Sequence, residues 1–176
     1  MKLLVALAFA SVFVHAEVVD SSASGFTVRT TLIIKASPQD IYRRFMHNIG
    51  EWWNPQHTFS GDARNLTIDE RPGGCLCEKL ADNGFSRHME IITALPGKRI
   101  VMRGALGPLQ TLAATCTLQI QMNTAEEGTK FEATYSVHGY LPNGMNTFAA
   151  PVDMVTAEQF TRLKNYVETG KPVVSK

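Results

Sequence analysis

The side chains best suited to chemistry gather first in the segment 52–62, which holds two tryptophans and a histidine. His57 is its candidate acid–base residue, because an imidazole with a pKa of roughly 6.5 exchanges protons near neutral pH. Arg87 is a candidate ligand-binding residue, since a guanidinium in a cavity could hold a carboxylate through two hydrogen bonds. Both have ordinary alternatives. A loop histidine is usually a surface residue, and an ion pair with Glu78 or Glu90 would also explain Arg87.

Three cysteines, Cys75, Cys77 and Cys116, form an odd set that cannot pair completely within one chain. Cys75 and Cys77 are two residues apart, so a bond between them would close a small, strained ring. The sequence therefore favours the interpretation of these cysteines as small, buried, apolar residues. A redox or metal pair, a disulfide to Cys116 and pairing between chains remain alternatives, although no Cys/His spacing is typical of a metal site.

Established catalytic motifs are absent from the sequence. It contains no nucleophile elbow, Walker loop, dinucleotide fingerprint or His-Glu-x-x-His zinc motif. Gly73-Gly74 precedes a predicted strand, so it is a turn and not a phosphate-binding loop. We expect no cofactor and no metal, and any catalysis would depend on one or two isolated acid–base groups.

The composition indicates one globular domain. The chain has 176 residues, 44% of them hydrophobic, with 17 basic and 16 acidic side chains. This apolar content excludes a disordered chain, and a formal net charge of +1 argues against a nucleic-acid partner.

The first residues have the pattern of a signal peptide. Lys2 is followed by the uncharged run 3–14, and Val14-His15-Ala16 offers a signal peptidase an acceptable residue at position −3 and a small one at −1. The run is too short to cross a membrane as a helix. We expect a signal peptide at 1–16, a short leader at 17–24, no integral membrane segment after removal, and a periplasmic or secreted protein.

A fold that contains both strands and helices is expected to position these candidate groups. Residues 26–35 are rich in β-branched side chains and predict a strand. Ser37 and Pro38 then begin a short helix, and a second short helix or turn follows near 51–55. Further strands, separated by glycine- or proline-containing turns, are expected at 63–70, 75–81, 85–94, 98–104, 111–122 and 130–140.

A long helix ends the domain, from residue 146 or 152 to Thr169, with Gly170 as its C-cap. Apolar and polar residues alternate along the last two predicted strands, so one face of the sheet is expected to face a core. The predicted fold is α+β: a curved antiparallel sheet of seven strands around a long C-terminal helix, with two short helices after the first strand.

Four stretches carry a resemblance to a known superfamily: residues 36–42, Trp52-Trp53, residues 71–78 and residues 160–172. In order and spacing, the chain over 25–172 resembles the START-like superfamily, also called SRPBCC or helix-grip proteins. This superfamily includes polyketide cyclase-like proteins and relatives of the heat-shock-protein ATPase activators. The resemblance implies one START-like domain at 25–172 and a C-terminal tail at 173–176.

The resemblance also implies a cavity between the sheet and the long helix, suited to a small apolar or amphipathic molecule. The residues expected to line it and bind that molecule are Trp53, Phe85, Arg87, Met89, Met102, Leu118, Tyr135, Phe148 and Met154.

The sequence is compatible with three candidate functions. The first is an exported binding protein, without a cofactor, that encloses such a molecule. The second is a cyclase, dehydratase or hydrolase that uses His57 with Arg87 or Tyr135. The third is an interaction module resembling the chaperone-activating relatives.

Overall fold

The computed structural model describes residues 14–173. The predicted signal peptide therefore lies outside the described residues, except for its last three positions. The C-terminal tail is described only at Val173.

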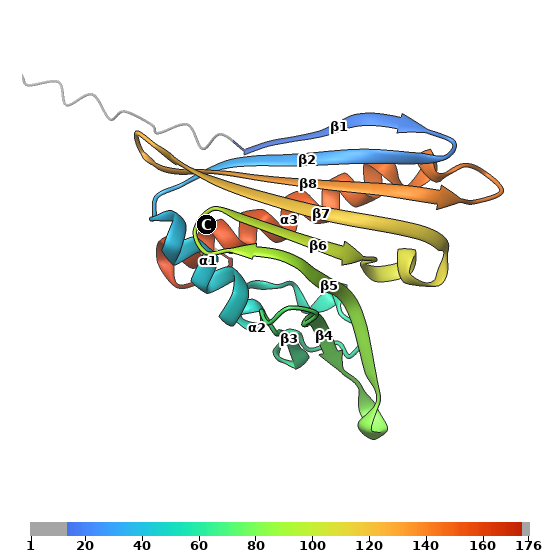
Figure 1. Ribbon diagram of the computed structural model, residues 1–176, viewed down its shortest axis with the longest axis horizontal. Helices are drawn as coiled ribbons and strands as arrows, with labels where there is room; N and C mark the ends of the chain where they lie inside the picture. The colour runs from blue at the N-terminus through green and yellow to red at the C-terminus, as the bar shows by residue number, and fades with distance from the viewer. Residues whose placement is uncertain (1–13, 174–176) are drawn as a thin grey trace, which may run out of the picture.

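An open antiparallel sheet of eight strands forms one layer, in the order β1-β2-β8-β7-β6-β5-β4-β3, and a long helix lies across one of its faces (Figure 1). The strands are β1 (Val14–Ser22), β2 (Gly25–Ile34), β3 (Leu66–Ile68), β4 (Cys75–Lys79), β5 (Phe85–Leu95), β6 (Arg99–Gly104), β7 (Ala113–Ala125) and β8 (Gly128–Tyr140). The predicted α+β fold is thus confirmed, with one strand more than expected.

The predicted helix start at Ser37-Pro38 and the predicted stop at Gly170 are confirmed, whereas the second short helix lies at 49–52 and not at 51–55. The helices are α1 (Pro38–His47), α2 (Ile49–Trp52) and α3 (Ala149–Thr169), with short 3-10 turns η1 (Pro55–His57), η2 (Ala63–Asn65), η3 (Ala81–Asn83), η4 (Gly107–Thr111) and η5 (Met145–Phe148). The Ser37 hydroxyl accepts the Asp40 N–H at 3.2 Å, which caps α1. Gly170 adopts a left-handed conformation, with φ of 76°, and ends α3.

The additional strand is β1, and it corrects the prediction of a leader at 17–24. Residues 14–22 pair with β2, with Glu17 opposite Arg29. The Arg29 guanidinium lies 3.5 Å from the Glu17 carboxylate. Because β1 is an edge strand with largely exposed side chains, it lacks the apolar alternation by which a strand is recognised in a sequence.

The core lies between the sheet and the helices. Along β8, the alternation predicted from the sequence is confirmed: Phe131, Ala133, Tyr135 and Val137 are all buried. Phe131 packs against Phe160 of α3, with ring centroids 5.3 Å apart. No helix within residues 14–173 has the length and hydropathy needed to cross a membrane.

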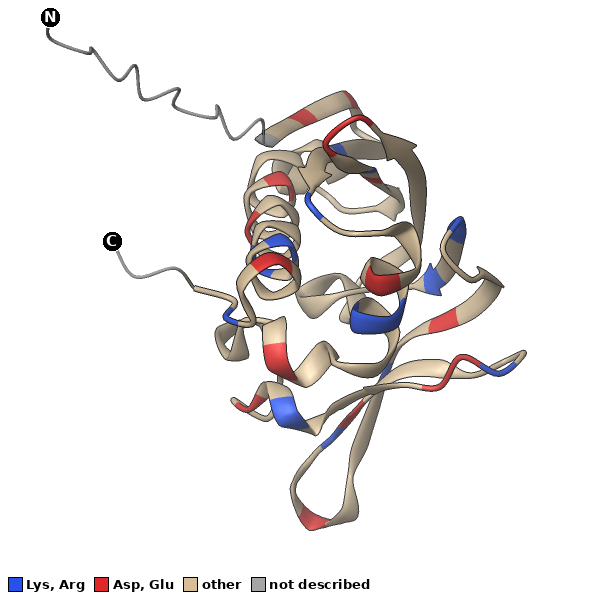
Figure 2. Cartoon of the chain, turned by 90° about the vertical axis from the view of Figure 1, so that its left-hand side faces the viewer, with Lys and Arg blue, Asp and Glu red and all other residues tan. Residues whose placement is uncertain are grey.

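Hydrogen bonds connect the C-terminal half of α3 to the end of β2 and to the residue that follows it. The Lys164 ammonium donates to the Ile33 carbonyl at 2.8 Å and pairs with Glu168. The Glu168 carboxylate in turn accepts the Lys35 N–H at 2.8 Å. Elsewhere in residues 14–173, basic and acidic residues are interspersed (Figure 2).

A register shift interrupts the pairing of β4 with β5. Leu76 pairs with Met89, but Cys77 pairs with Arg87, so His88 is an extra residue on β5. As a result His88 and Met89 are both buried although they are neighbours in a strand.

Candidate functional site

A cavity of about 370 Å³ lies between the sheet and α3. This volume is within the range of small-molecule sites, roughly 300–1,000 Å³. Its wall is mostly apolar and comes from α1, α2, the loops around η1 and η4, the sheet, η5 and α3. The lining residues are Phe45, Ile49, Trp53, Gln56, His57, Thr58, Phe59, Leu76, Leu106, Gly107, Pro108, Leu109, Leu118, Tyr135, Phe148, Pro151, Val152, Val155, Thr156, Gln159 and Phe160.

Helix α3 contributes one of its faces to the cavity. Val152, Val155, Thr156 and Gln159 follow the three- and four-residue spacing that puts helical side chains on one side. The Thr156 hydroxyl donates back to the Val152 carbonyl at 2.8 Å, which leaves its methyl group as an apolar surface. Gln159 is almost fully buried, at 1% exposed.

Tyr135 of β8 joins the sheet to the η4 loop. Its hydroxyl accepts the Leu106 N–H at 3.1 Å, so the loop is held over the cavity. Burial raises the pKa of Tyr135 well above its ordinary value of 10, and the nearby Cys116 thiol raises it further. The phenol therefore stays protonated at physiological pH and acts as a neutral group.

His57 stands at the rim of the cavity, with its side chain about one third exposed. Its Nε2 lies 3.2 Å from the Glu158 carboxylate on α3. Its carbonyl accepts the Trp53 indole N–H at 3.1 Å, which fixes the tryptophan in the wall. The Asn54 side chain also donates to Glu158, so the η1 loop is tied to α3 at two neighbouring points.

A buried carboxylate holds the next part of the same loop. Glu78, 1% exposed, accepts the Phe59 N–H at 3.1 Å, the Ser60 N–H at 2.6 Å and His88 Nε2 at 2.8 Å. His88 Nδ1 lies 3.2 Å from the Gln110 amide nitrogen, so Nδ1 accepts and the hydrogen is on Nε2. Burial raises the pKa of Glu78, but these hydrogen bonds outweigh it and leave that pKa below its usual value.

The structure places five of the predicted site residues in the cavity wall: Trp53, His57, Leu118, Tyr135 and Phe148. Their contact with a ligand stays a prediction. Five others, Phe85, Arg87, Met89, Met102 and Met154, are not in the wall, and for them the predicted position is wrong.

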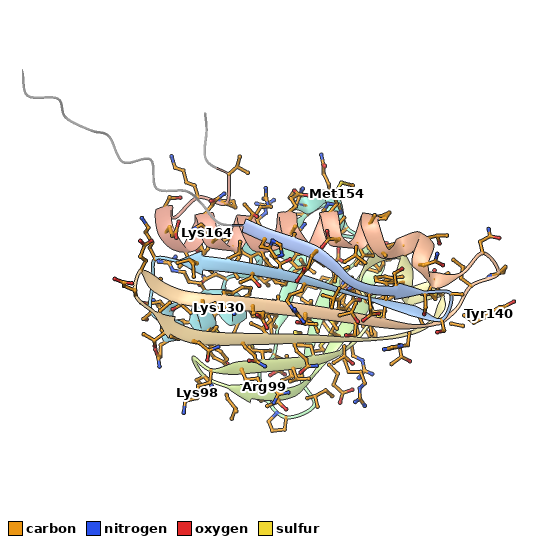
Figure 3. All side chains as sticks on the ribbon, turned by 90° about the horizontal axis from the view of Figure 1, so that it is seen from above. Lys98, Arg99, Lys130, Tyr140, Met154 and Lys164 are labelled. Carbon is orange, nitrogen blue, oxygen red and sulfur yellow. A yellow bond between two sulfur atoms is a disulfide. The ribbon has the colours of Figure 1, made fainter. Side chains whose placement is uncertain are left out.

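Two of these five point to solvent. Phe85 is 76% exposed because it begins β5 at the tip of the projecting β4–β5 hairpin (Figure 1). Met154 is 72% exposed, on the side of α3 away from the sheet (Figure 3). Its neighbour Val155 takes the cavity position instead.

The other three have structural roles. Arg87 is exposed and lies 3.7 Å from Glu90, so its ordinary ion-pair explanation is confirmed. It borders a second, more polar depression of about 250 Å³. Met89 and Met102, 1% and 0% exposed, fill the core beneath the sheet.

The sequence did not indicate the wall residues that come from the η4 loop, from α1 and α2, and from most of the α3 face. The helical spacing of Val152, Val155 and Gln159 was a usable signal for α3. No local pattern indicates Leu106 or Leu109, because the wall position of the η4 loop depends on the distant Tyr135.

The cysteines also correct a prediction. Cys75 and Cys77 form a disulfide, and Cys116 is a buried free thiol. The Cα atoms of Cys75 and Cys77 are 5.4 Å apart, shorter than the roughly 6.6 Å that two residues of a regular strand span. This distance falls within the ordinary disulfide range, and the pairing of β4 with β5 shifts register between Leu76 and Cys77. Within residues 14–173, no three or more His, Cys, Asp or Glu side chains gather as a metal site would require.

Solved structures share this arrangement of sheet and helix. One is an uncharacterized protein from Rhizobium leguminosarum, with a TM-score of 0.59 and 18% identity over 89% of this chain and 98% of that one. CalU16 from Micromonospora echinospora has a TM-score of 0.59 and 12% identity, over 93% and 88%. DynU16, from the dynemicin biosynthetic locus, has a TM-score of 0.56 and 18% identity, over 83% of this chain and 48% of that one.

The chain shares their fold. No family model and no curated protein sequence matches it. At these identities the likeness extends to the fold alone, which is a sheet packed on a C-terminal helix.

Proposed function

We propose that this protein is an exported START-like binding protein that encloses a small apolar or amphipathic molecule between the sheet and α3. The observation that carries the proposal is the 370 Å³ cavity with its predominantly apolar wall. Each square ångström of apolar surface that a ligand buries there contributes about 25 cal/mol. Aromatic rings such as Trp53, Phe59 and Phe148 offer flat surfaces to it.

The rim supports an amphipathic ligand. Gln56, His57 and Thr58 are exposed or half-buried, whereas Leu118 and Tyr135 on the sheet side of the wall are buried. A molecule with an apolar body and one polar end would thus keep that end near water.

The test compares two tryptophan substitutions that are adjacent in α3. Val155→Trp fills the cavity from its wall, whereas Met154→Trp adds the same ring on the exposed side. Native mass spectrometry and fluorescence titration with a panel of fatty acids, ketones and aromatic hydrocarbons measure binding. We expect the wild type and Met154→Trp to bind and Val155→Trp to lose at least ten-fold in affinity. No binding by the wild type, or equal binding by both variants, would refute the proposal.

Export is a separate part of the proposal, and it is supported by the pattern of residues 1–16. Expression of the full chain followed by N-terminal sequencing tests it. A mature protein that begins near Glu17 outside the cytoplasm is the expected result. An intact N-terminus on a cytoplasmic protein would overturn it.

A proton-transfer enzyme of the cyclase, dehydratase or hydrolase kind is the second candidate. The observation that favours it is the His57–Glu158 pair at the rim, since a carboxylate that orients an imidazole is typical of a general base. Tyr135 shares the same wall as a protonated donor, but Arg87 does not. DynU16, which has this fold, comes from a biosynthetic locus.

Deuterium exchange distinguishes the two candidates. A general base at His57 would remove a proton from the carbon beside the carbonyl of a bound ketone such as 1-tetralone and return a deuteron from D2O. Mass spectrometry would then detect exchange with the wild type and none with His57→Gln. Binding without accelerated exchange excludes this ketone chemistry and leaves the binding protein.

A further inference from the structure

Gln159 presents an unsatisfied hydrogen-bond donor in the cavity wall. Its Oε1 accepts the Asn54 N–H at 2.9 Å, and this bond determines which end of the amide is oxygen. The other end, Nε2, is buried and has no hydrogen-bond partner among the described residues. Gln159 itself lines the cavity.

Such a donor is unusual because most buried polar groups in folded proteins have a partner. Solvent outside the protein does not reach Nε2, since Gln159 is only 1% exposed. The hydroxyl of Thr156, one turn away on the same face, donates to the Val152 carbonyl and makes no hydrogen bond with Nε2. An acceptor for Gln159 must therefore enter through the cavity.

We infer that the bound molecule is an apolar compound with a neutral carbonyl oxygen, which accepts a hydrogen bond from Gln159 Nε2. This inference rests on the proposed binding function and specifies its ligand class. An oxygen atom at this place satisfies the buried amide, while the body of the molecule packs against the apolar wall.

The charges around the cavity favour a neutral acceptor over a carboxylate. None of the lining residues is a lysine or an arginine. Arg162, on the same helix, donates instead to the Trp52 carbonyl at 2.9 Å. His57 at the rim already faces the Glu158 carboxylate. A buried anionic ligand would consequently lack a counter-charge, which is costly in an apolar environment.

The experiment measures affinity for 9-fluorenone, for fluorene, which has no carbonyl, and for fluorene-9-carboxylate. Two variants are compared with the wild type. Gln159→Met removes the donor at similar volume, and Gln159→Glu keeps an oxygen for the Asn54 N–H but replaces the donor. Urea unfolding confirms that each variant is folded, and the infrared carbonyl stretch of bound fluorenone reports its hydrogen bond directly.

We expect the preference for fluorenone over fluorene to fall about 3- to 10-fold in both variants, as for one lost hydrogen bond. The carbonyl stretch should lie at lower frequency in the wild type than in Gln159→Met. An unchanged preference and stretch would overturn the inference but not the proposed function, because water would then satisfy the amide. Tightest binding of the carboxylate would overturn the neutral class. Failure of the wild type to bind any of these compounds or the wider panel would refute the proposed function itself.

Discussion

Replacing Glu78 with glutamine should destabilise the protein strongly. The carboxylate receives hydrogen bonds from Phe59, Ser60 and His88 inside the protein, and it is 1% exposed. An amide of the same shape presents its NH2 group to one or more of these donors. Each hydrogen bond to a charged group contributes about 1.5–3 kcal/mol, so losing one or two of them, with their donors left buried and unpaired, costs several kcal/mol. We expect the free energy of unfolding to fall by about 3–5 kcal/mol.

Urea unfolding followed by tryptophan fluorescence measures this loss, with Glu90→Gln as the matched control. Glu90 is another carboxylate near β4 and β5, but it is about two-fifths exposed and 3.7 Å from Arg87. Its replacement should cost no more than about 1 kcal/mol. A Glu78→Gln loss of the same size as the control would refute the reasoning.

The pH dependence gives a second check. The pKa of Glu78 is below its usual 4.5 in the folded protein, so the ionised form is the one that folding stabilises. Its contribution is complete above about pH 4.5 and is lost as the pH falls through the lowered pKa. The difference between wild type and Glu78→Gln should therefore shrink in acid. A difference that grows in acid would contradict the assigned hydrogen bonds.

Three further predictions concern other parts of the molecule. Alkylation of the unreduced, denatured protein should label one cysteine, Cys116, and labelling of all three without reductant would disprove the disulfide. The Tyr42 phenol should titrate at a pKa of about 12 in an alkaline absorbance titration, because burial and its hydrogen bond to Glu70 both raise that pKa. Since burial is the larger cause, Glu70→Gln should reverse the shift only in part. Gly104→Ala should lower the melting temperature, because φ there is +150° and the new Cβ would lie 2.3 Å from the His88 carbonyl oxygen. An unchanged melting temperature would contradict this prediction and show that the strand can shift to make room.

Features that depend on neighbours in the sequence could be predicted. The cap at Ser37, the stop at Gly170 and the burial of Phe131 and Tyr135 all follow from residues within a few positions. Leu118 and Tyr135 could also be placed in the wall, because leucine and aromatic side chains on the inner face of a covered sheet are expected to be buried there.

Features that arise from pairing between distant segments could not be predicted. The register shift at His88 moves Arg87 to solvent and brings His88 to Glu78, and neither change has a signal in the strand itself. The orientation of the Gln159 amide depends on Asn54, more than a hundred residues earlier. For Met154 the helix was predicted, but its exposed side was not.

The order of the strands has a consequence for how the chain folds. Strands β3 to β7 each pair with the next strand in sequence, so they can assemble as successive hairpins. Strand β2, by contrast, pairs with β8, with Phe26 opposite Val137. During synthesis β1 can pair with one edge of β2 at once, but the other edge has no partner strand until β8 emerges, more than ninety residues after β2 ends. Closing so long a loop is slow. The chain should then pass through a period in which Phe26, Val28 and Leu32 are uncovered, and a holding chaperone that shields them would raise the folded yield.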